Sequence, residues 1–222
     1  TGVSNTLIGA LAGDALDVGG ENVAIGTAAL TADSKGSHST AVGRGALQSQ
    51  NFTSATDTFN TAVGFQAGAA VTTGIENVLI GGVAGDALTD ADFNIAIGVS
   101  TLTQDTKGSK TVAIGGGALN AQNFTSATDT HNVAVGFHAG NDVTTGIKNT
   151  MIGNLSGDKL TDADFNVAVG FGSLSEDIQG SRSVAIGAFA LEVQAFSSAT
   201  NADNVAVGVN AGSAVLTGVK NT

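Results

Sequence analysis

The chain has 222 residues, a formal net charge of −11, 32 glycines and no proline, cysteine, tryptophan or tyrosine. The lack of cysteine excludes disulfides and thiolate metal sites, and eight scattered Lys and Arg argue against a nucleic-acid-binding surface. The acidity also leads us to expect repulsion of anionic membranes and other polyanions. No run of 18 apolar residues of the kind that a transmembrane helix requires is present.

A short motif, N-[VTI]-x-[IV]-G, recurs along the whole chain. It predicts twelve strands, at residues 5–9, 22–26, 39–43, 60–64, 77–81, 94–98, 111–115, 132–136, 149–153, 166–170, 183–187 and 204–208. Asn opens nine motifs and Gly closes all twelve; the motifs with both are Asn5 to Gly9, Asn22 to Gly26, Asn60 to Gly64, Asn77 to Gly81, Asn94 to Gly98, Asn132 to Gly136, Asn149 to Gly153, Asn166 to Gly170 and Asn204 to Gly208.

The spacing of the closing glycines defines the domain organisation. Three spacings of 17 residues alternate with one of 21, which gives a 72-residue unit. We therefore expect a single repeat domain over 1–222, made of units 1–72, 73–144 and 145–216 and the start of a fourth. The chain opens with TGVSNT and closes with TGVKNT, at the same phase of the repeat, so we expect it to be a segment of a longer fibre.

The segments between the strands show no apolar stripe of helical period and are rich in turn-forming residues. The sequence therefore predicts an all-β fold, a parallel β-solenoid or β-roll of about twelve coils. At about 4.8 Å per stacked strand, the rod should be roughly 58 Å long. The 21-residue spacings predict a lateral bulge in every fourth coil, where the octet at 51–58 recurs unchanged at 123–130 and in altered form at 195–202.

Alternation along each strand gives it two apolar faces. The second and fourth motif positions carry Val, Ile or Thr, whereas the third is Ala in nine coils and Leu7, Leu79 or Met151 in the others. Two apolar faces predict burial on both sides, so we expect self-association with the Ala-rich or Leu face against symmetry mates. The repeated Asn predicts a ladder of side-chain amides between coils. Four residues beyond the motif glycine, each unit carries Gly, Leu, Leu and Gly in turn.

The motif NxAxGxxA closely resembles the head repeat of trimeric autotransporter adhesins, the YadA-like head, and similar repeats in phage tail-fibre proteins. The resemblance covers the whole chain in twelve motif copies, although the coils are longer than is common in that family. It implies a left-handed β-roll with three chains side by side, in an extracellular fibre on a cell surface or a virion.

For function, the resemblance implies a structural or adhesive shaft that spaces or presents a binding tip. The partners expected are two further copies of the chain and a host-cell or matrix glycan or protein receptor; a phage or virus tail-fibre shaft is the alternative. An ice- or glycan-binding solenoid ranks lower, because the Thr row in the second motif position is interrupted by Val and Ile. We expect no enzyme, because no nucleophile–base arrangement or phosphate-binding loop stands apart from the repeat.

Two groups of residues are candidates for ligand contact. The carboxylate pairs Asp90 with Asp92 and Asp162 with Asp164 lie in turns and could bind Ca²⁺, but solvated turn carboxylates are the favoured explanation. No other cofactor is expected. Phe52, Phe124 and Phe196 share one position in the bulges, and Phe93 and Phe165 share another. We expect these rings to plug their loops as local core, with a stacking platform for sugars as the alternative. Phe65, Phe137 and Phe171, directly after motif glycines, are expected to pack at the coil edge.

Overall fold

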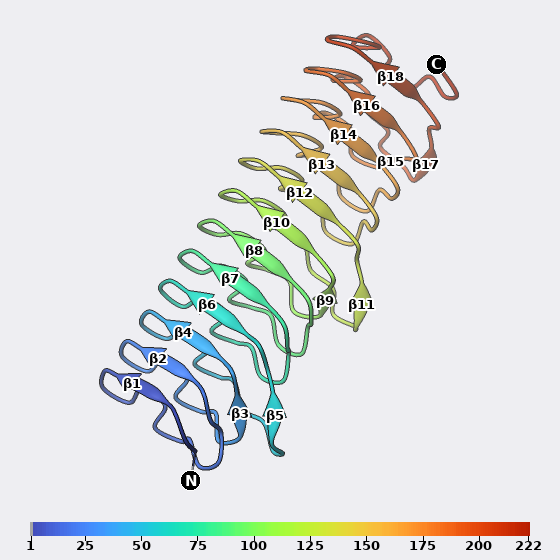
Figure 1. The fold of residues 1–222 in the computed structure, drawn as a ribbon. Coiled ribbons are helices and arrows are strands. Elements are labelled where there is room, and N and C mark those ends of the chain that lie inside the picture. The colour runs from blue at the N-terminus through green and yellow to red at the C-terminus, as the bar shows by residue number, and fades with distance from the viewer. Residues whose placement is uncertain (1) are drawn as a thin grey trace.

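Each of the twelve motifs folds as a three-residue strand, and these strands form one continuous parallel sheet. A computed structural model describes residues 2–222, which contain eighteen strands and no helix. The twelve-stranded sheet follows chain order (Figure 1): β1 (Thr6–Ile8), β2 (Val23–Ile25), β4 (Thr40–Val42), β6 (Thr61–Val63), β7 (Val78–Ile80), β8 (Ile95–Ile97), β10 (Val112–Ile114), β12 (Val133–Val135), β13 (Thr150–Ile152), β14 (Val167–Val169), β16 (Val184–Ile186) and β18 (Val205–Val207). The predicted all-β parallel solenoid of about twelve coils is thus confirmed.

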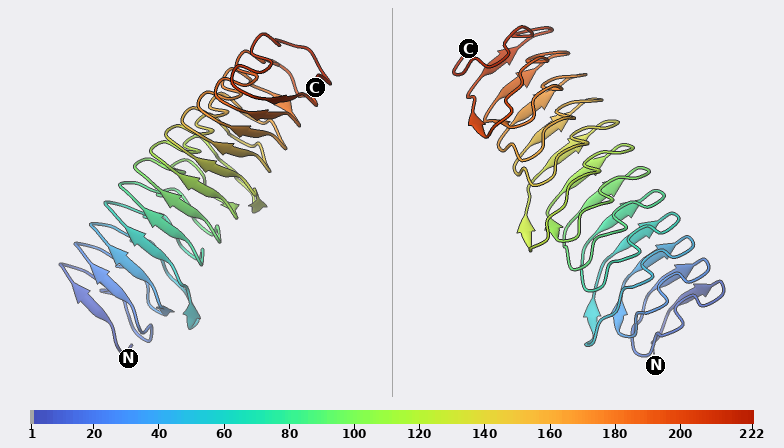
Figure 2. Two further views of the ribbon diagram at one scale, coloured as in Figure 1. Left: turned by 45° about the horizontal axis from the view of Figure 1, so that its top comes forward. Right: turned by 180° about the vertical axis from the view of Figure 1, so that it is seen from behind.

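The lateral bulges are also present, as short parallel strand pairs beside the main sheet. β3 (Gly36–Ser37) pairs with β5 (Thr56–Asp57), β9 (Gly108–Ser109) with β11 (Thr128–Asp129), and β15 (Gly180–Ser181) with β17 (Thr200–Asn201). Figures 1 and 2 show the pairs on one side of the rod, with β5 and β11 projecting beyond the neighbouring coils. The 21-residue spacing is therefore the length of a coil that reaches further sideways.

The interior of each coil is filled by the third motif position. From the second coil to the eleventh this side chain is fully buried, as in Ala24, Leu79 and Met151. The second and fourth positions point outwards and are half-buried or exposed, as in Val23 and Ile25. The expectation that the Ala or Leu face meets symmetry mates is therefore wrong. The reason is space, because a coil this narrow admits only a methyl group from most of its strands.

The motif glycines hold a conformation that other residues cannot adopt. Their φ angles all lie between +126° and +145°, a region accessible essentially only to glycine. A Cβ at Gly26 would also lie 2.6 Å from the backbone carbonyl of Gly43 in the next coil. Glycine is therefore required at the end of each motif for two reasons: the backbone bends there after the strand, and the backbones of neighbouring coils stack closely.

The Gly, Leu, Leu, Gly pattern in the fourth position after the motif glycine is explained by volume. Leu79 is larger than the alanines of neighbouring strands, and a Cβ at Gly68 or Gly85 would lie 2.6 or 2.8 Å from its methyl groups. In the second and third coils of each unit the strand residue is Ala, and the same position carries a fully buried leucine such as Leu102 or Leu119. In the fourth coil both positions are small, and Leu79 of the next coil fills the space at Gly68. All these positions are left-handed, with φ between +48° and +62°. The interior is therefore filled by exchanging bulk between positions of one coil and of its neighbour.

The motif asparagines form the predicted ladder, but they bond mainly to backbone. The side chain of Asn77 accepts a hydrogen bond from the backbone N–H of Asn94 (3.0 Å) and donates one to the carbonyl of Ala91 (2.9 Å). All nine asparagines donate in this way to the carbonyl fourteen residues ahead. The ladder thus ties each strand to the far side of its own coil and to the coil that follows.

Candidate binding surfaces

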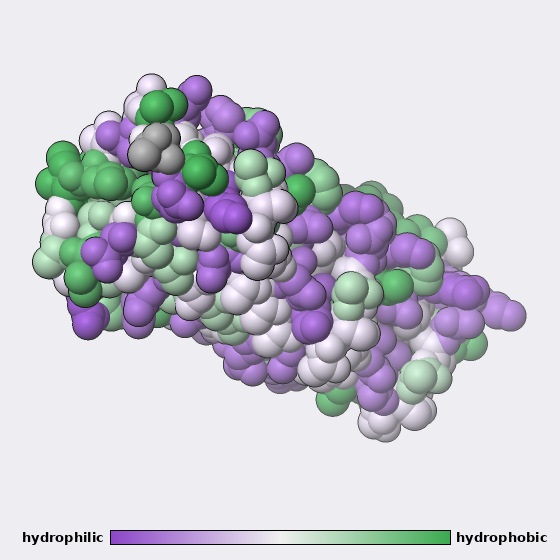
Figure 3. All heavy atoms as spheres, turned by 90° about the horizontal axis from the view of Figure 1, so that it is seen from below, coloured by the Kyte–Doolittle hydropathy of each residue, from purple (hydrophilic) through white to green (hydrophobic). Residues whose placement is uncertain are grey.

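The outer face of the main sheet is an apolar stripe along the rod. It consists of the second and fourth motif positions of every coil, which are Val, Ile or Thr and lie in register between neighbouring strands. Ile80, Ile152 and Ile186 are 36%, 40% and 39% exposed. Figure 3 shows the molecule from below, with the N-terminal end at the left, and hydrophobic patches among hydrophilic ones, the largest near that end. No other part of the described chain covers this stripe.

A buried polar network anchors each lateral bulge. Asp105 is fully buried, and its Oδ1 accepts the backbone N–H groups of Gly108 and Phe124, each at 3.0 Å. Its Oδ2 accepts from Gln122 Nε2 at 2.6 Å, and Gln122 Oε1 accepts from Asn132 Nδ2 at 2.8 Å. Asp33 with Gln50 and Asp177 with Gln194 repeat the arrangement. Sequence analysis missed this network, although its Asp and Gln recur at the 72-residue period.

The same network explains the third coil of each unit, where Ser or Thr opens the motif. Gln50 Nε2 donates to Ser39 Oγ at 2.8 Å, and Asn60 Nδ2 donates to Gln50 Oε1 at 2.8 Å. The glutamine therefore bridges the break in the asparagine ladder. These buried polar side chains all have hydrogen-bond partners, which rigidifies the bulge.

The phenylalanines fall into a buried set and an exposed set. Phe52, Phe124 and Phe196 are each 7% exposed, so they are local core of the bulges and not an accessible stacking platform. The prediction that Phe93 and Phe165 plug their loops was wrong, because they are 46% and 47% exposed. The rings expected at the coil edge are half exposed there and contact neighbouring side chains: Arg44 lies over Phe65, Phe137 stacks on His138, and Phe171 meets Phe189.

A notch opens at the turns that follow the sheet, between coils six and eight. Gly116 and Gly117 form its floor, because they carry no side chain where neighbouring coils carry Val99 or Phe137. The rings of Phe137 and His138 stack at 4.1 Å along one wall, and the depression has a volume of about 400 Å³.

The residue directly before each motif forms a second surface, which we call the edge row. All thirteen members have left-handed φ angles between +51° and +63°, and none is glycine: Ser4, Glu21, His38, Phe59, Glu76, Phe93, Lys110, His131, Lys148, Phe165, Arg182, Asp203 and Lys220. Their side chains meet between coils, as where the rings of His38 and Phe59 stack at 5.2 Å and Lys148 Nζ lies 4.9 Å from the ring centre of Phe165. The edge row therefore runs continuously along the start of the strands.

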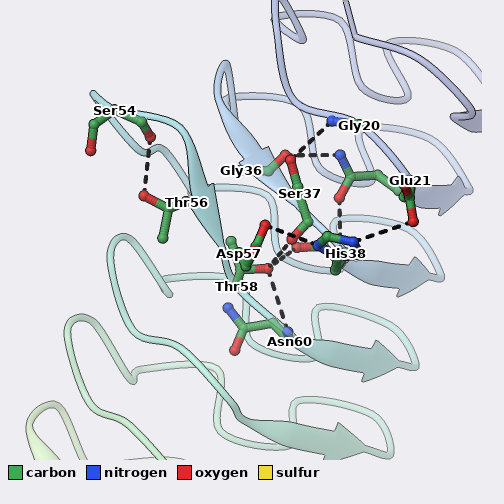
Figure 4. Close-up of polar contacts among 12 residues, drawn as sticks. Gly20, Glu21, Gly36, Ser37, His38, Ser54, Thr56, Asp57, Thr58 and Asn60 are labelled. Carbon is green, nitrogen blue, oxygen red and sulfur yellow. Dashed lines mark hydrogen bonds and ion pairs between the residues drawn. The ribbon is translucent and has the colours of Figure 1, made fainter.

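The edge row also contacts the bulges. In Figure 4, His38 lies between Glu21 of the preceding coil and Asp57 of β5, with nitrogen–oxygen distances of 3.3 and 3.1 Å. One unit further on, Lys110 Nζ lies 2.5 Å from Asp129 Oδ2 of β11. The ammonium group of Lys110 lowers the pKa of Asp129. The bulges therefore border the edge row and place carboxylates beside its cations.

The carboxylates proposed for calcium are already engaged with the protein. Asp92 Oδ1 accepts the backbone N–H of Ile75 at 2.8 Å, and Asp164 Oδ1 accepts that of Ile147 at 2.8 Å. Asp90 lies 3.6 Å from Lys107 Nζ, and Asp162 accepts from Thr161. Within residues 2–222, no group of three or more His, Asp or Glu is placed to hold a metal ion. Calcium at these pairs stays a prediction.

Two other aspartates carry a buried oxygen without a hydrogen-bond partner, Oδ1 of Asp86 and Oδ1 of Asp158. Burial raises the pKa of both carboxyl groups, partly opposed by hydrogen bonds from their own backbone. Since a lone buried oxygen disfavours the charged form, these positions are strained at neutral pH.

Comparison with protein-family models, curated proteins and solved structures finds no significant match for this chain. Residues 2–222 hold no helix long and apolar enough to cross a membrane.

Proposed function

We propose that this chain is one of the three chains of a homotrimeric extracellular fibre, in which it forms a stiff shaft that spaces or presents a binding tip. The observation that carries the proposal is the apolar stripe. It continues through all twelve coils, and its side chains are aligned by the register of the parallel sheet. Association along this stripe would remove Val and Ile side chains from water over the full length of the rod.

The interior supports a mechanical role. Every coil is tied to the next by strand hydrogen bonds, by the asparagine ladder and by turn hydrogen bonds such as Gly85 N–H to Thr101 O at 2.9 Å. Stacked repeats distribute stability along the chain. The result is a rod whose length follows from the number of repeats, which suits a spacer. This proposal includes the left-handed coil and three-chain packing implied by the resemblance to adhesin heads, and holds for a bacterial surface or a virion.

A charge introduced into the apolar stripe tests the proposal. In the variant Ile114→Lys/Val135→Lys, each outward position would carry an ammonium group that cannot be desolvated in an interface. We expect this variant to be monomeric with an unchanged circular dichroism spectrum.

The matched control is Val99→Lys/Phe137→Lys, which replaces two exposed apolar side chains at the turns instead. It should retain the mass of the unmodified protein. Equal masses for both variants and the parent would rule out the stripe as the interface.

A further inference from the structure

The C-terminal part of the edge row has a chemical pattern that the rest of the row lacks. Over six successive coils, aromatic rings and basic side chains alternate without interruption: Phe93, Lys110, His131, Lys148, Phe165 and Arg182. All six side chains are exposed, and Phe93 and Phe165 are 46% and 47% accessible. The earlier coils differ, since Glu21 and Glu76 occupy the row there.

The alternation is built on a backbone conformation that favours glycine or asparagine. Phe93, Lys110 and Phe165 have φ angles of +59°, +61° and +59°. Elsewhere in the coil, the left-handed positions are the motif glycine, the glycine or leucine four residues after it, and the position two residues after it, which holds varied residues such as Val83 and His138. The edge-row side chains do not fill the interior; they lie at the surface, where neighbouring members meet one another. The row therefore presents large side chains from a backbone conformation that is unfavourable for them.

Stacking sets the spacing of the pattern. Backbone hydrogen bonds hold the row in register, as from Phe93 N–H to Ile75 O (3.1 Å) and from Lys110 N–H to Asp92 O (3.0 Å). With about 4.8 Å per coil, rings recur every two coils, at roughly 10 Å, and cations recur at the same interval between them. This interval is close to the length of a disaccharide in an extended polysaccharide.

From this spacing we infer that the segment of the edge row from Phe93 to Arg182 binds a linear polysaccharide with a carboxylate on every second sugar. The rings take the C–H faces of alternate sugars, since the negative face of an aromatic ring attracts such hydrogens. Lys110, Lys148 and Arg182 pair with the uronic carboxylates, and Arg182 offers a two-pronged contact. The inference needs only an exposed rod, so it goes beyond the proposed shaft and does not require the trimer.

The spacing of cations in the edge row fits such a polysaccharide better than a nucleic acid. A nucleic-acid strand carries a phosphate about every 3.4 Å, roughly three times the density of cations in the row. The acidity of the whole chain does not prevent binding, because fields beyond about 8 Å are screened at physiological salt. Of the eight Lys and Arg in the chain, three lie within these six positions, so the local charge opposes the expectation from composition that every polyanion is repelled.

The contacts that the edge-row side chains already make do not prevent them from binding a polysaccharide. Lys110 pairs with Asp129, and Lys148 lies over Phe165, but both lysines are solvent-exposed. Exposed ion pairs and cation–π contacts are weak and exchange easily. They hold the side chains extended along the row until a polymer carboxylate replaces the contact.

The test is binding of hyaluronan, which has one carboxylate in each disaccharide, to the full chain by biolayer interferometry at low and physiological salt. Dextran serves as the neutral probe, and single-stranded DNA as the probe for a nucleic-acid site. We expect saturable, salt-sensitive binding of hyaluronan only. The variant Lys110→Gln/Lys148→Gln/Arg182→Gln should weaken binding at least about tenfold, because it removes three charged contacts.

A matched control keeps the change in net charge but lies off the row. Lys35→Gln/Lys107→Gln/Lys159→Gln should alter binding less than about twofold, whereas Phe93→Leu/Phe165→Leu should weaken it about threefold or more. Light scattering and melting of each variant separate this question from assembly. The inference would be overturned if hyaluronan did not bind, or if both triple variants lost the same amount of affinity. It would also be overturned if dextran bound as well as hyaluronan or if DNA bound more strongly. Each of these results would count even if the trimer is confirmed.

Discussion

Replacing Leu79 with alanine tests the volume exchange that keeps the interior of the solenoid filled. Leu79 is fully buried, and its methyl groups occupy the space above Gly68 and Gly85. Leu→Ala replacements in cores cost about 2–5 kcal/mol, with the larger values where the cavity cannot collapse. Here the flanking coils are fixed by backbone hydrogen bonds, such as Gly68 N–H to Ala84 O and Gly85 N–H to Thr101 O, both 2.9 Å. We therefore expect a loss of about 4 kcal/mol.

Compensation distinguishes volume exchange from simple loss of a leucine. The double variant Leu79→Ala/Gly85→Leu gives the fifth coil the sixth coil's residues at these two positions, where Ala96 is followed by Leu102 at φ +55°. It should recover part of the loss, because only Leu88, 2.9 Å from a Cβ at position 85, must still move, whereas Gly85→Leu alone should destabilise because its side chain would meet both Leu79 and Leu88. Leu79→Met is the mild control, since Met151 fills the same position one unit later, and should cost under about 1.5 kcal/mol.

Urea denaturation followed by circular dichroism gives the free energy of unfolding for the four variants and the parent. We expect a favourable coupling energy between positions 79 and 85. Additive losses in the double variant, or a double variant less stable than either single one, would refute volume exchange as the reason for the Gly, Leu, Leu, Gly pattern.

The other predictions concern the polar interior and two titrating carboxyls. Asn132→Ala should cost about 3 kcal/mol in urea denaturation, because it leaves the buried N–H of Asn149 and the carbonyls at Gln122 and Gly146 unpaired; an effect below about 1 kcal/mol would contradict the ladder. Asp105→Ala should release the second bulge, seen as faster hydrogen exchange over 107–109 and 123–130 with the main sheet unchanged, because it leaves four donors without their acceptor. Uniform exchange across the chain would argue against a local anchor. Asp86→Asn should raise the melting temperature at pH 7: burial raises the pKa of Asp86 when folded, so its ionisation destabilises the fold above that pKa, and the gain should vanish below the unfolded value of 3.8. A variant less stable than the parent at pH 7 would disprove the sign.

The solenoid itself was predictable because every coil repeats the same sequence motif at a regular spacing. Glycine at a fixed position in each motif marks the bend after the strand, and the spacing of 17 or 21 residues gives the length of the coil. The lateral bulges follow from the longer spacing, and their recurring octet shows that they are one structure used three times.

The orientation of the strands was not predictable from alternation alone, since both faces of each strand are apolar. Residue size holds the missing information: Ala41 and Ala62 fit inside the coil, whereas Val42 and Val63 are too large for most coils and point outwards. The same crowding explains why Phe93 and Phe65 are exposed, because an interior filled by Ala and Leu leaves no space for their rings. The buried Asp and Gln were missed because polar residues in a bulge were taken for surface.

The candidate surfaces were visible only in part. The bulges were recognised as outward departures, but the edge row depends on thirteen positions that share a backbone conformation and not a residue type. Because their identities vary from Glu21 to Arg182, the sequence pattern treats them as unconstrained. Their common φ angle is what defines them as one surface.

The mass of the protein in solution tests the proposed trimeric shaft most directly. Light scattering at low and high protein concentration should give three times the chain mass of 21.6 kDa at both, because the apolar stripe would hold the copies together along the whole rod. A mass of 21.6 kDa at both concentrations would mean that the stripe stays exposed in a monomeric solenoid, and the proposal of a trimeric shaft would be wrong.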